Sequence, residues 1–125
     1  GQSKWRGEQA VVAALPKHII LRTAWVVSPY GHNFVKTMLR LSASKPELGV
    51  VDDQIGSPTY APHLADAILT IAARLRDVGA DQMSWGLYHA TGAGEATWCA
   101  LARETFRLSA ERGGTSAHVS RHHIR

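Results

Sequence analysis

The chain has 125 residues, of which 45% are hydrophobic and 19% charged, a balance that suits one globular domain and argues against a largely disordered protein. No apolar run approaches the roughly 18 residues of a membrane helix, so we expect no membrane span. The net charge of +4 comes without a Lys/Arg run or interleaved aromatic residues, which argues against a nucleic-acid partner.

The first half of the chain predicts helix, strand, helix and strand in that order. Residues 3–15 repeat apolar side chains at helical spacing and stop at Pro16. Residues 19–23 are a short apolar run rich in isoleucine, typical of a strand inside a parallel sheet. After a turn at 28–31, Asn33 is a good N-cap for a helix that ends near residue 44, and residues 48–51 predict a second strand.

The second half repeats the alternation. A polar loop over 52–58 leads into a predicted helix over 62–78, with Pro62 in its first turn and Gly79 as its C-cap. Residues 86–90 predict a third strand and residues 95–111 a last helix, whereas residues 114–125 have the composition of a disordered tail. This order predicts an α/β fold with parallel strands, and no linker divides residues 1–113 into separate domains.

Some residues of types that often act in catalysis or ligand binding do not indicate a functional site here. The single cysteine, Cys99, lies on the apolar face of the last predicted helix, so we expect a buried, unreactive thiol and a reducing compartment. His122 and His123 are adjacent and would point apart, which is a poor arrangement for a metal ion. The pair Gly92-x-Gly94 follows a predicted strand but lacks the third glycine of a dinucleotide-binding loop.

Several blocks of sequence together resemble one enzyme family. Ser3-Lys4 opens a helix, and the strand that follows ends in R-T-A-W-V. Further blocks are N-F-V-K-T-M-L-R-L, V-V-D-D-Q-I-G-S-P-T, L-A-D-A-I-L and Y-H-A-T-G-x-G. Over roughly residues 1–111 the chain resembles the extended short-chain dehydrogenase/reductases, and within them the dTDP-4-dehydrorhamnose reductase family. From Gly113 onward it departs from the family pattern, as a truncated or shifted reading frame would.

The resemblance implies the carboxy-terminal part of a Rossmann-like, doubly wound parallel sheet, with elements of a small substrate-binding region. The complete enzyme would be cytoplasmic and would reduce the 4-keto group of dTDP-4-dehydro-6-deoxy-L-mannose with NADPH or NADH, giving dTDP-L-rhamnose. The family's catalytic tyrosine stands four residues before its lysine, which places it ahead of Gly1. We therefore expect residues 1–113 to be a partial NAD(P)-dependent reductase domain, without the dinucleotide-binding half and catalytic tyrosine, and inactive alone.

The resemblance assigns site roles to Lys4, Trp25 and Asn33. Lys4 would be catalytic and cofactor-binding, since its ammonium would lower the tyrosine pKa and hydrogen-bond the cofactor ribose, although a lysine at a helix start is usually a solvated charge. Trp25 would contact the sugar, with core packing as the alternative. Asn33 would contact the substrate near its diphosphate, with helix capping as the alternative.

The resemblance implies a dTDP-sugar substrate and neither a nucleic-acid nor a membrane partner. It allows Mg²⁺, which some family members use, and a homodimer of the full-length enzyme. Other functions stay open at this stage: another nucleotide-sugar reductase or epimerase of the superfamily, a non-catalytic regulatory relative, or a gene remnant.

Overall fold

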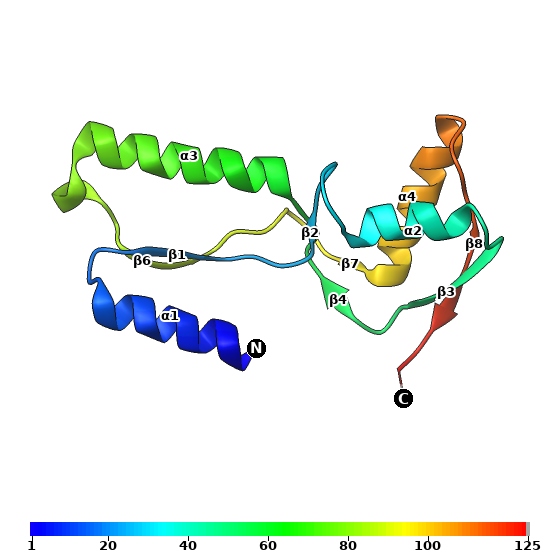
Figure 1. Cartoon of the computed structure of the whole chain (residues 1–125), viewed down its shortest axis with the longest axis horizontal. Coiled ribbons are helices and arrows are strands. Elements are labelled where there is room, and N and C mark those ends of the chain that lie inside the picture. Colours follow the sequence, from blue (N-terminus) through cyan, green and yellow to red (C-terminus); the bar gives the residue numbers. More distant parts are fainter. Residues whose placement is uncertain (125) are drawn as a thin grey trace. The chain divides into compact units, whose positions relative to one another are not determined.

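A computed structural model describes residues 1–124, and the chain divides into two compact units (Figure 1). Unit 1 is built from Gly1–Thr23 and Pro62–Thr91, and unit 2 from Ala24–Ala61 and the chain from Gly92 onward. No linker marks this division in the sequence, because each unit combines two separate stretches of the chain. Among residues 1–124, no helix is both long enough and apolar enough to cross a membrane.

Unit 1 contains most of the elements that the periodicity predicts. They are α1 (Gln2–Ala14), β1 (Ile19–Arg22), α3 (Ala61–Val78) and β6 (Gly86–His89). A short 3-10 helix that the sequence did not predict, η1 (Ala80–Gln82), follows α3. β1 and β6 pair in parallel, with Ile19 opposite Gly86 and Arg22 opposite His89, as an α/β fold requires. Gly79 has a φ of 77° and donates its N–H to the Leu75 carbonyl, which confirms it as the C-cap of α3.

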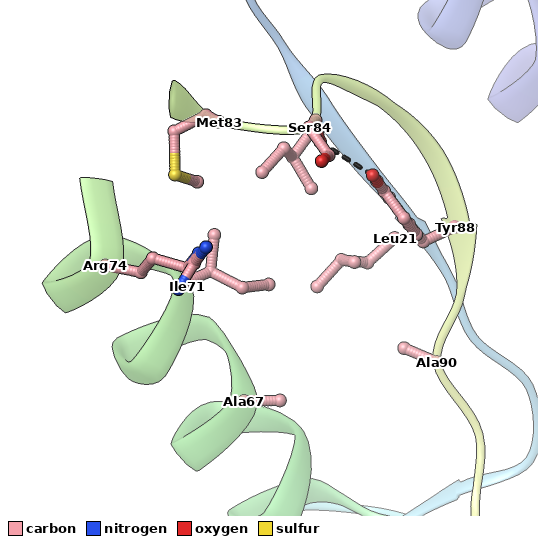
Figure 2. A pocket seen from close by; sticks show the side chains of 9 residues that line it. Leu21, Ala67, Ile71, Arg74, Met83, Ser84, Tyr88 and Ala90 are labelled. Carbon is pink, nitrogen blue, oxygen red and sulfur yellow. Dashed lines mark hydrogen bonds between the residues drawn. The ribbon is translucent and has the colours of Figure 1, made fainter. Parts of the chain in front are cut away.

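The apolar faces of unit 1 are largely uncovered within the part of the chain that the structure describes. None of its described hydrophobic side chains is buried, and α1 and α3 each lack a buried residue. A hollow of about 330 Å³ lies between α3 and the β1–β6 pair, lined by apolar side chains that include Leu21, Ile71 and Met83 (Figure 2). Large hydrophobic residues exposed on unit 1 are Trp5, Val11, Val12, Leu15, Ile68, Leu69, Leu75, Val78, Leu87 and Tyr88.

Within the described residues, unit 2 contains two α-helices and three pairs of strands. Its elements are β2 (Val26–Val27), α2 (Phe34–Ser42), β3 (Glu47–Val51), β4 (Ile55–Gly56), β5 (Thr59–Tyr60), β7 (Ala96–Thr97), α4 (Trp98–Glu111) and β8 (His118–His122). The pairs β2–β5 and β3–β8 are parallel, and β4–β7 is antiparallel. β4 lies where the sequence predicted a loop, and β7 takes the first residues of the helix predicted over 95–111, so α4 begins later than predicted. Two-residue strands carry no alternation pattern of their own.

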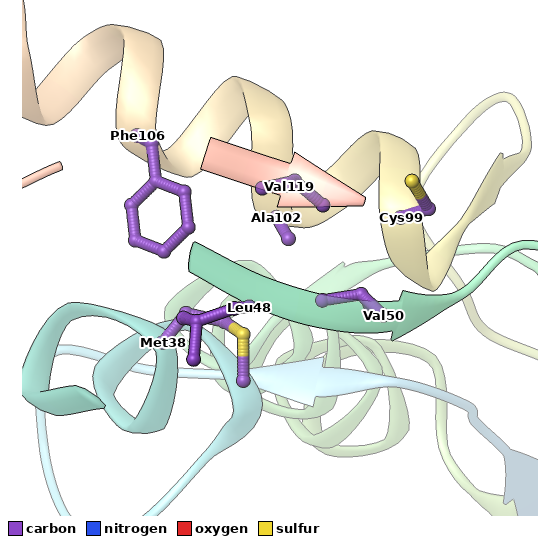
Figure 3. Close-up of a cluster of buried hydrophobic side chains, with 7 residues drawn as sticks. All are labelled: Met38, Leu48, Val50, Cys99, Ala102, Phe106 and Val119. Atoms are coloured by element: carbon purple, nitrogen blue, oxygen red, sulfur yellow. The ribbon is translucent and has the colours of Figure 1, made fainter. Parts of the chain in front are cut away.

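The buried core of the described residues belongs to unit 2 and forms where α4 packs against β3, β8 and α2 (Figure 3). Its members are Met38, Leu48, Val50, Cys99, Ala102, Phe106 and Val119. Strand β3 supplies alternate residues, as expected of a strand with one face buried. Cys99 is completely buried, which confirms the predicted environment of the thiol, and this burial raises its pKa.

The prediction of a disordered tail over residues 114–125 is wrong for His118–His122, which form β8. β8 runs parallel to β3, with His118 opposite Glu47 and His122 opposite Val51. Val119 enters the core and Ala117 packs against it, so apolar contacts and the edge of β3 order a segment that is polar in composition.

Candidate functional site

Lys4 lies near the start of α1 in unit 1, and its side chain points into solvent. It has no hydrogen bond or ion pair with any residue in the range 1–124. The other two site residues predicted from the sequence, Trp25 and Asn33, belong to unit 2. The surroundings of Lys4 are therefore described only by the residues of unit 1.

The helix that carries Lys4 is attached to β1 by a bidentate ion pair that sequence reasoning missed. Arg22 donates from Nε to Glu8 Oε1 at 2.9 Å and from Nη2 to Glu8 Oε2 at 2.7 Å. Glu8 stands one helical turn after Lys4, and its hydrogen bond from Arg22 lowers its pKa. Spacing along a helix could not reveal this pair, because Arg22 comes from the strand.

Trp25 lies in unit 2 with its backbone in the left-handed region, at a φ of 49°. It is the only non-glycine residue with positive φ among residues 1–124, and this conformation costs a bulky side chain of the order of 1–3 kcal/mol. Its indole stacks on Trp98, with ring centroids 3.5 Å apart and planes inclined by 13°. Phe34 packs on Trp98 in turn, at a centroid distance of 4.6 Å.

The absence of a side chain at Gly56 makes room for the Trp25 ring. A Cβ at Gly56 would lie 2.4 Å from Trp25 Cε2 and 2.7 Å from its Nε1, so only glycine admits the ring. Trp25 is half-buried. The ring therefore takes part in packing and also keeps a surface open to solvent, which suits either alternative raised by the sequence.

Asn33 is confirmed as the N-cap of α2. Its Oδ1 accepts from Lys36 N at 3.1 Å, and its Nδ2 donates to Ser28 O at 2.7 Å, so both ends of the amide hold the preceding turn against the helix. Lys36 Nζ adds a 3.0 Å bond to Pro29 O. A hollow of about 230 Å³ beside this turn is lined by Gly31, His32, Lys36, Thr37 and Arg40, three of which carry nitrogen groups suited to an anion.

The adjacent acids Asp52 and Asp53, just after the end of β3, bind different partners. Asp52 Oδ1 accepts a 2.6 Å bond from the Thr97 hydroxyl, and its Oδ2 lies 3.2 Å from Arg121 Nε. Asp53 Oδ2 instead accepts from Ile124 N at 2.9 Å. The Thr97 hydroxyl, and then the charge of Arg121, hold the pKa of Asp52 below its usual value, which leaves this residue ill suited to act as an acid.

The Gly92-x-Gly94 turn is a packing feature. A Cβ on Gly92 would meet Pro58 O at 2.0 Å, and Gly92 N donates to Thr59 Oγ1 at 3.3 Å. A backbone this close to Pro58 leaves no room for a phosphate at that point. In residues 1–124 no three His, Cys, Asp or Glu side chains come together to hold a metal ion.

Known proteins match this chain over almost its whole length. The family model described as "RmlD substrate binding domain" matches residues 1–123. A dTDP-4-dehydrorhamnose reductase from Sinorhizobium fredii is 46% identical over 119 residues, which are 95% of this chain and 40% of that protein. The match through residue 123 corrects the expectation that the resemblance stops near residue 111.

Solved structures share the fold. A dTDP-4-dehydrorhamnose reductase from Clostridium acetobutylicum superposes with a TM-score of 0.84 at 35% identity, over 99% of this chain and 40% of that one. One from Bacillus anthracis, solved in complex with NADP, gives 0.76 at 33% identity over the same shares. The chain thus spans about 40% of the length of these relatives, with mixed α/β structure and parallel strand pairs. It belongs to the RmlD substrate binding domain family.

Proposed function

We propose that this chain is part of an NAD(P)H-dependent reductase that converts dTDP-4-dehydro-6-deoxy-L-mannose to dTDP-L-rhamnose. The observation that carries the proposal is the family match over residues 1–123, supported by relatives named dTDP-4-dehydrorhamnose reductase. One of the structural relatives binds NADP, which favours NADPH as the reductant.

Lys4 is the residue of this chain proposed to act in the reaction. Its exposed ammonium is free to stand beside a tyrosine phenol supplied by the remainder of the protein. A positive charge there favours the phenolate and lowers the phenol pKa, which helps the phenol to pass its proton to the carbonyl oxygen. The nicotinamide cofactor, when bound, supplies the hydride.

The residues of this chain fit only part of a cofactor site. Lys4 can donate a hydrogen bond to a ribose hydroxyl, whereas the Gly92 turn packs on Pro58 and cannot cradle a pyrophosphate. We propose that the remainder of the protein binds the phosphates, and that the same remainder covers the exposed apolar faces of α1 and α3. The isolated chain is then expected to show no reductase activity.

Unit 2 is proposed to bind the sugar nucleotide. Trp25 offers a half-buried indole on which the hexose ring can rest. Asn33 shapes the turn beside the hollow of His32, Lys36 and Arg40, whose nitrogen groups suit the substrate diphosphate. Asn33 would then assist substrate binding indirectly, because it fixes the turn beside this hollow.

Lys4→Met in the complete protein tests the proposal. It removes the charge and keeps the bulk of the side chain, so the turnover number should fall at least about a hundredfold, the low end for general acid–base assistance. Lys45→Met, which removes an exposed lysine outside α1, is the matched control and should leave the rate unchanged.

The same assay separates the other functions. Full activity of Lys4→Met would refute the catalytic role. Turnover of a different dTDP- or other nucleotide-bound keto sugar in place of the proposed substrate would identify another reductase of the superfamily. Absence of turnover by the unmodified complete protein with every such sugar would instead favour a regulatory relative or a gene remnant.

A further inference from the structure

A chain of contacts runs from Asp52, just after β3, to the Trp25 indole. The Asp52 side chain is only 16% exposed, and its Oδ1 accepts the hydroxyl proton of Thr97 at 2.6 Å. The same hydroxyl oxygen accepts from Ala100 N at 3.0 Å, so Thr97 caps α4 while it binds Asp52. The next residue, Trp98, opens α4 and stacks on Trp25.

The Trp25 ring is held mainly by residues outside its own segment. Its left-handed backbone is strained, and a conformation of this kind persists only where the surroundings impose it. The ring stacks on Trp98 and lies where a Cβ on Gly56 would clash with it. In the β4–β7 pair Gly56 stands opposite Ala96, and Ile55 stands opposite Thr97. Gly56 is therefore paired with the strand that carries Thr97, the residue bound by Asp52, and Trp98 directly follows that strand.

We propose that Asp52 is a positioning residue for Trp25, and that it acts through Thr97 and Trp98 to set the surface on which the sugar ring of the substrate rests. The sugar contact rests on the proposed function, whereas the positioning stands on the geometry of unit 2. Arg121 also binds Asp52, but it comes from β8 and its side chain is 65% exposed, so its ion pair contributes little to the position of Trp98.

Nuclear magnetic resonance of the tryptophan indoles tests the positioning in the complete protein. Trp25→Phe assigns the Trp25 indole resonance, and Trp98→Leu gives its position once the stacked ring is gone. Asp52→Ala and Thr97→Val should each move the Trp25 resonance toward the Trp98→Leu position, since Thr97→Val keeps the side-chain shape and removes only the hydroxyl. Thr97→Ser, which keeps the hydroxyl, and Asp53→Ala, at the neighbouring acid, should leave it unchanged.

Kinetics of the same variants test the consequence for the substrate. In Asp52→Ala the KM for the dTDP-sugar should rise roughly tenfold, about the change in a binding constant that the loss of one hydrogen bond causes. The KM for the cofactor and kcat should change little, because the lost interaction holds the sugar in ground state and transition state alike.

The outcomes separate the inference from the proposed function. An unchanged Trp25 resonance in both Asp52→Ala and Thr97→Val would overturn the inference, whatever the activity. Arg121→Gln that shifts the resonance as far as Asp52→Ala would also overturn it, because the ion pair and not Thr97 would then hold the ring. A shifted resonance with an unchanged KM for the sugar would support the positioning role and count against the sugar contact of Trp25.

Discussion

Replacing Gly92 by alanine should destabilise unit 2. The new Cβ would lie 2.0 Å from Pro58 O, whereas ordinary C···O contacts begin near about 3.3 Å, so the two backbone segments would have to separate by about 1.3 Å. The obstacle is a backbone carbonyl, so no side chain can rotate out of the way. The same movement would lengthen the 3.3 Å hydrogen bond from Gly92 N to Thr59 Oγ1.

The expected loss of stability is about 2 kcal/mol. Overpacking of this kind costs about 1–3 kcal/mol, and a weakened hydrogen bond adds about 0.5–1.5 kcal/mol. Alanine recovers about 0.4–1 kcal/mol because it restricts the unfolded chain. Since each 1.4 kcal/mol changes an equilibrium constant tenfold, a net loss of about 2 kcal/mol raises the population of opened unit 2 about thirtyfold.

Cys99 provides the assay, because it is the chain's single cysteine and is completely buried in the core of unit 2. A thiol reagent can reach it only when the unit opens, and the labelling rate tracks the opened population when closing outpaces labelling. Gly92→Ala should therefore be labelled about thirtyfold faster than the unmodified chain. Gly49→Ala is the matched control in the same unit, since a Cβ there meets only Ser120 Oγ at 3.9 Å. Equal labelling of the two variants would refute the reasoning.

Other consequences follow from the same structure. Phe106 is 4% exposed, so Phe106→Ala should cost about 3–5 kcal/mol and make Cys99 reactive without denaturant, which a thiol titration checks. The lowered pKa of Asp52 stabilises unit 2 above the ordinary carboxyl pKa, and this contribution is lost as the pH falls through the lowered value. Circular dichroism should therefore show a stability difference between the unmodified chain and Asp52→Asn that shrinks below about pH 4, and a constant difference would contradict this origin. The apolar residues exposed on unit 1 predict self-association of the isolated chain, which light scattering would contradict by finding a monomer at every concentration.

The sequence by itself determined the elements whose signals are local. Asn33 caps α2 through the N–H of Lys36, three residues on, and Gly79 ends α3 with positive φ. The apolar run at 19–23 became β1, and the burial of Cys99 followed from helical spacing. These features depend on residues within one or two turns of each other, so their physics is contained in short stretches of sequence.

Only the tertiary structure decided which distant residues meet. Asp52 binds Thr97, which lies 45 positions further along the chain. Trp25 stacks on Trp98, which opens α4, whereas the helix that follows Trp25 in the chain is α2. No local sequence signal indicates that either pair forms. The sequence identified Trp25 as a candidate contact, but its strained backbone and the requirement for glycine at position 56 appear only when the segments pack together. β8 became ordered for the same reason, because the edge of β3 and the core around Val119 supply hydrogen bonds and apolar contacts that a polar segment cannot supply for itself.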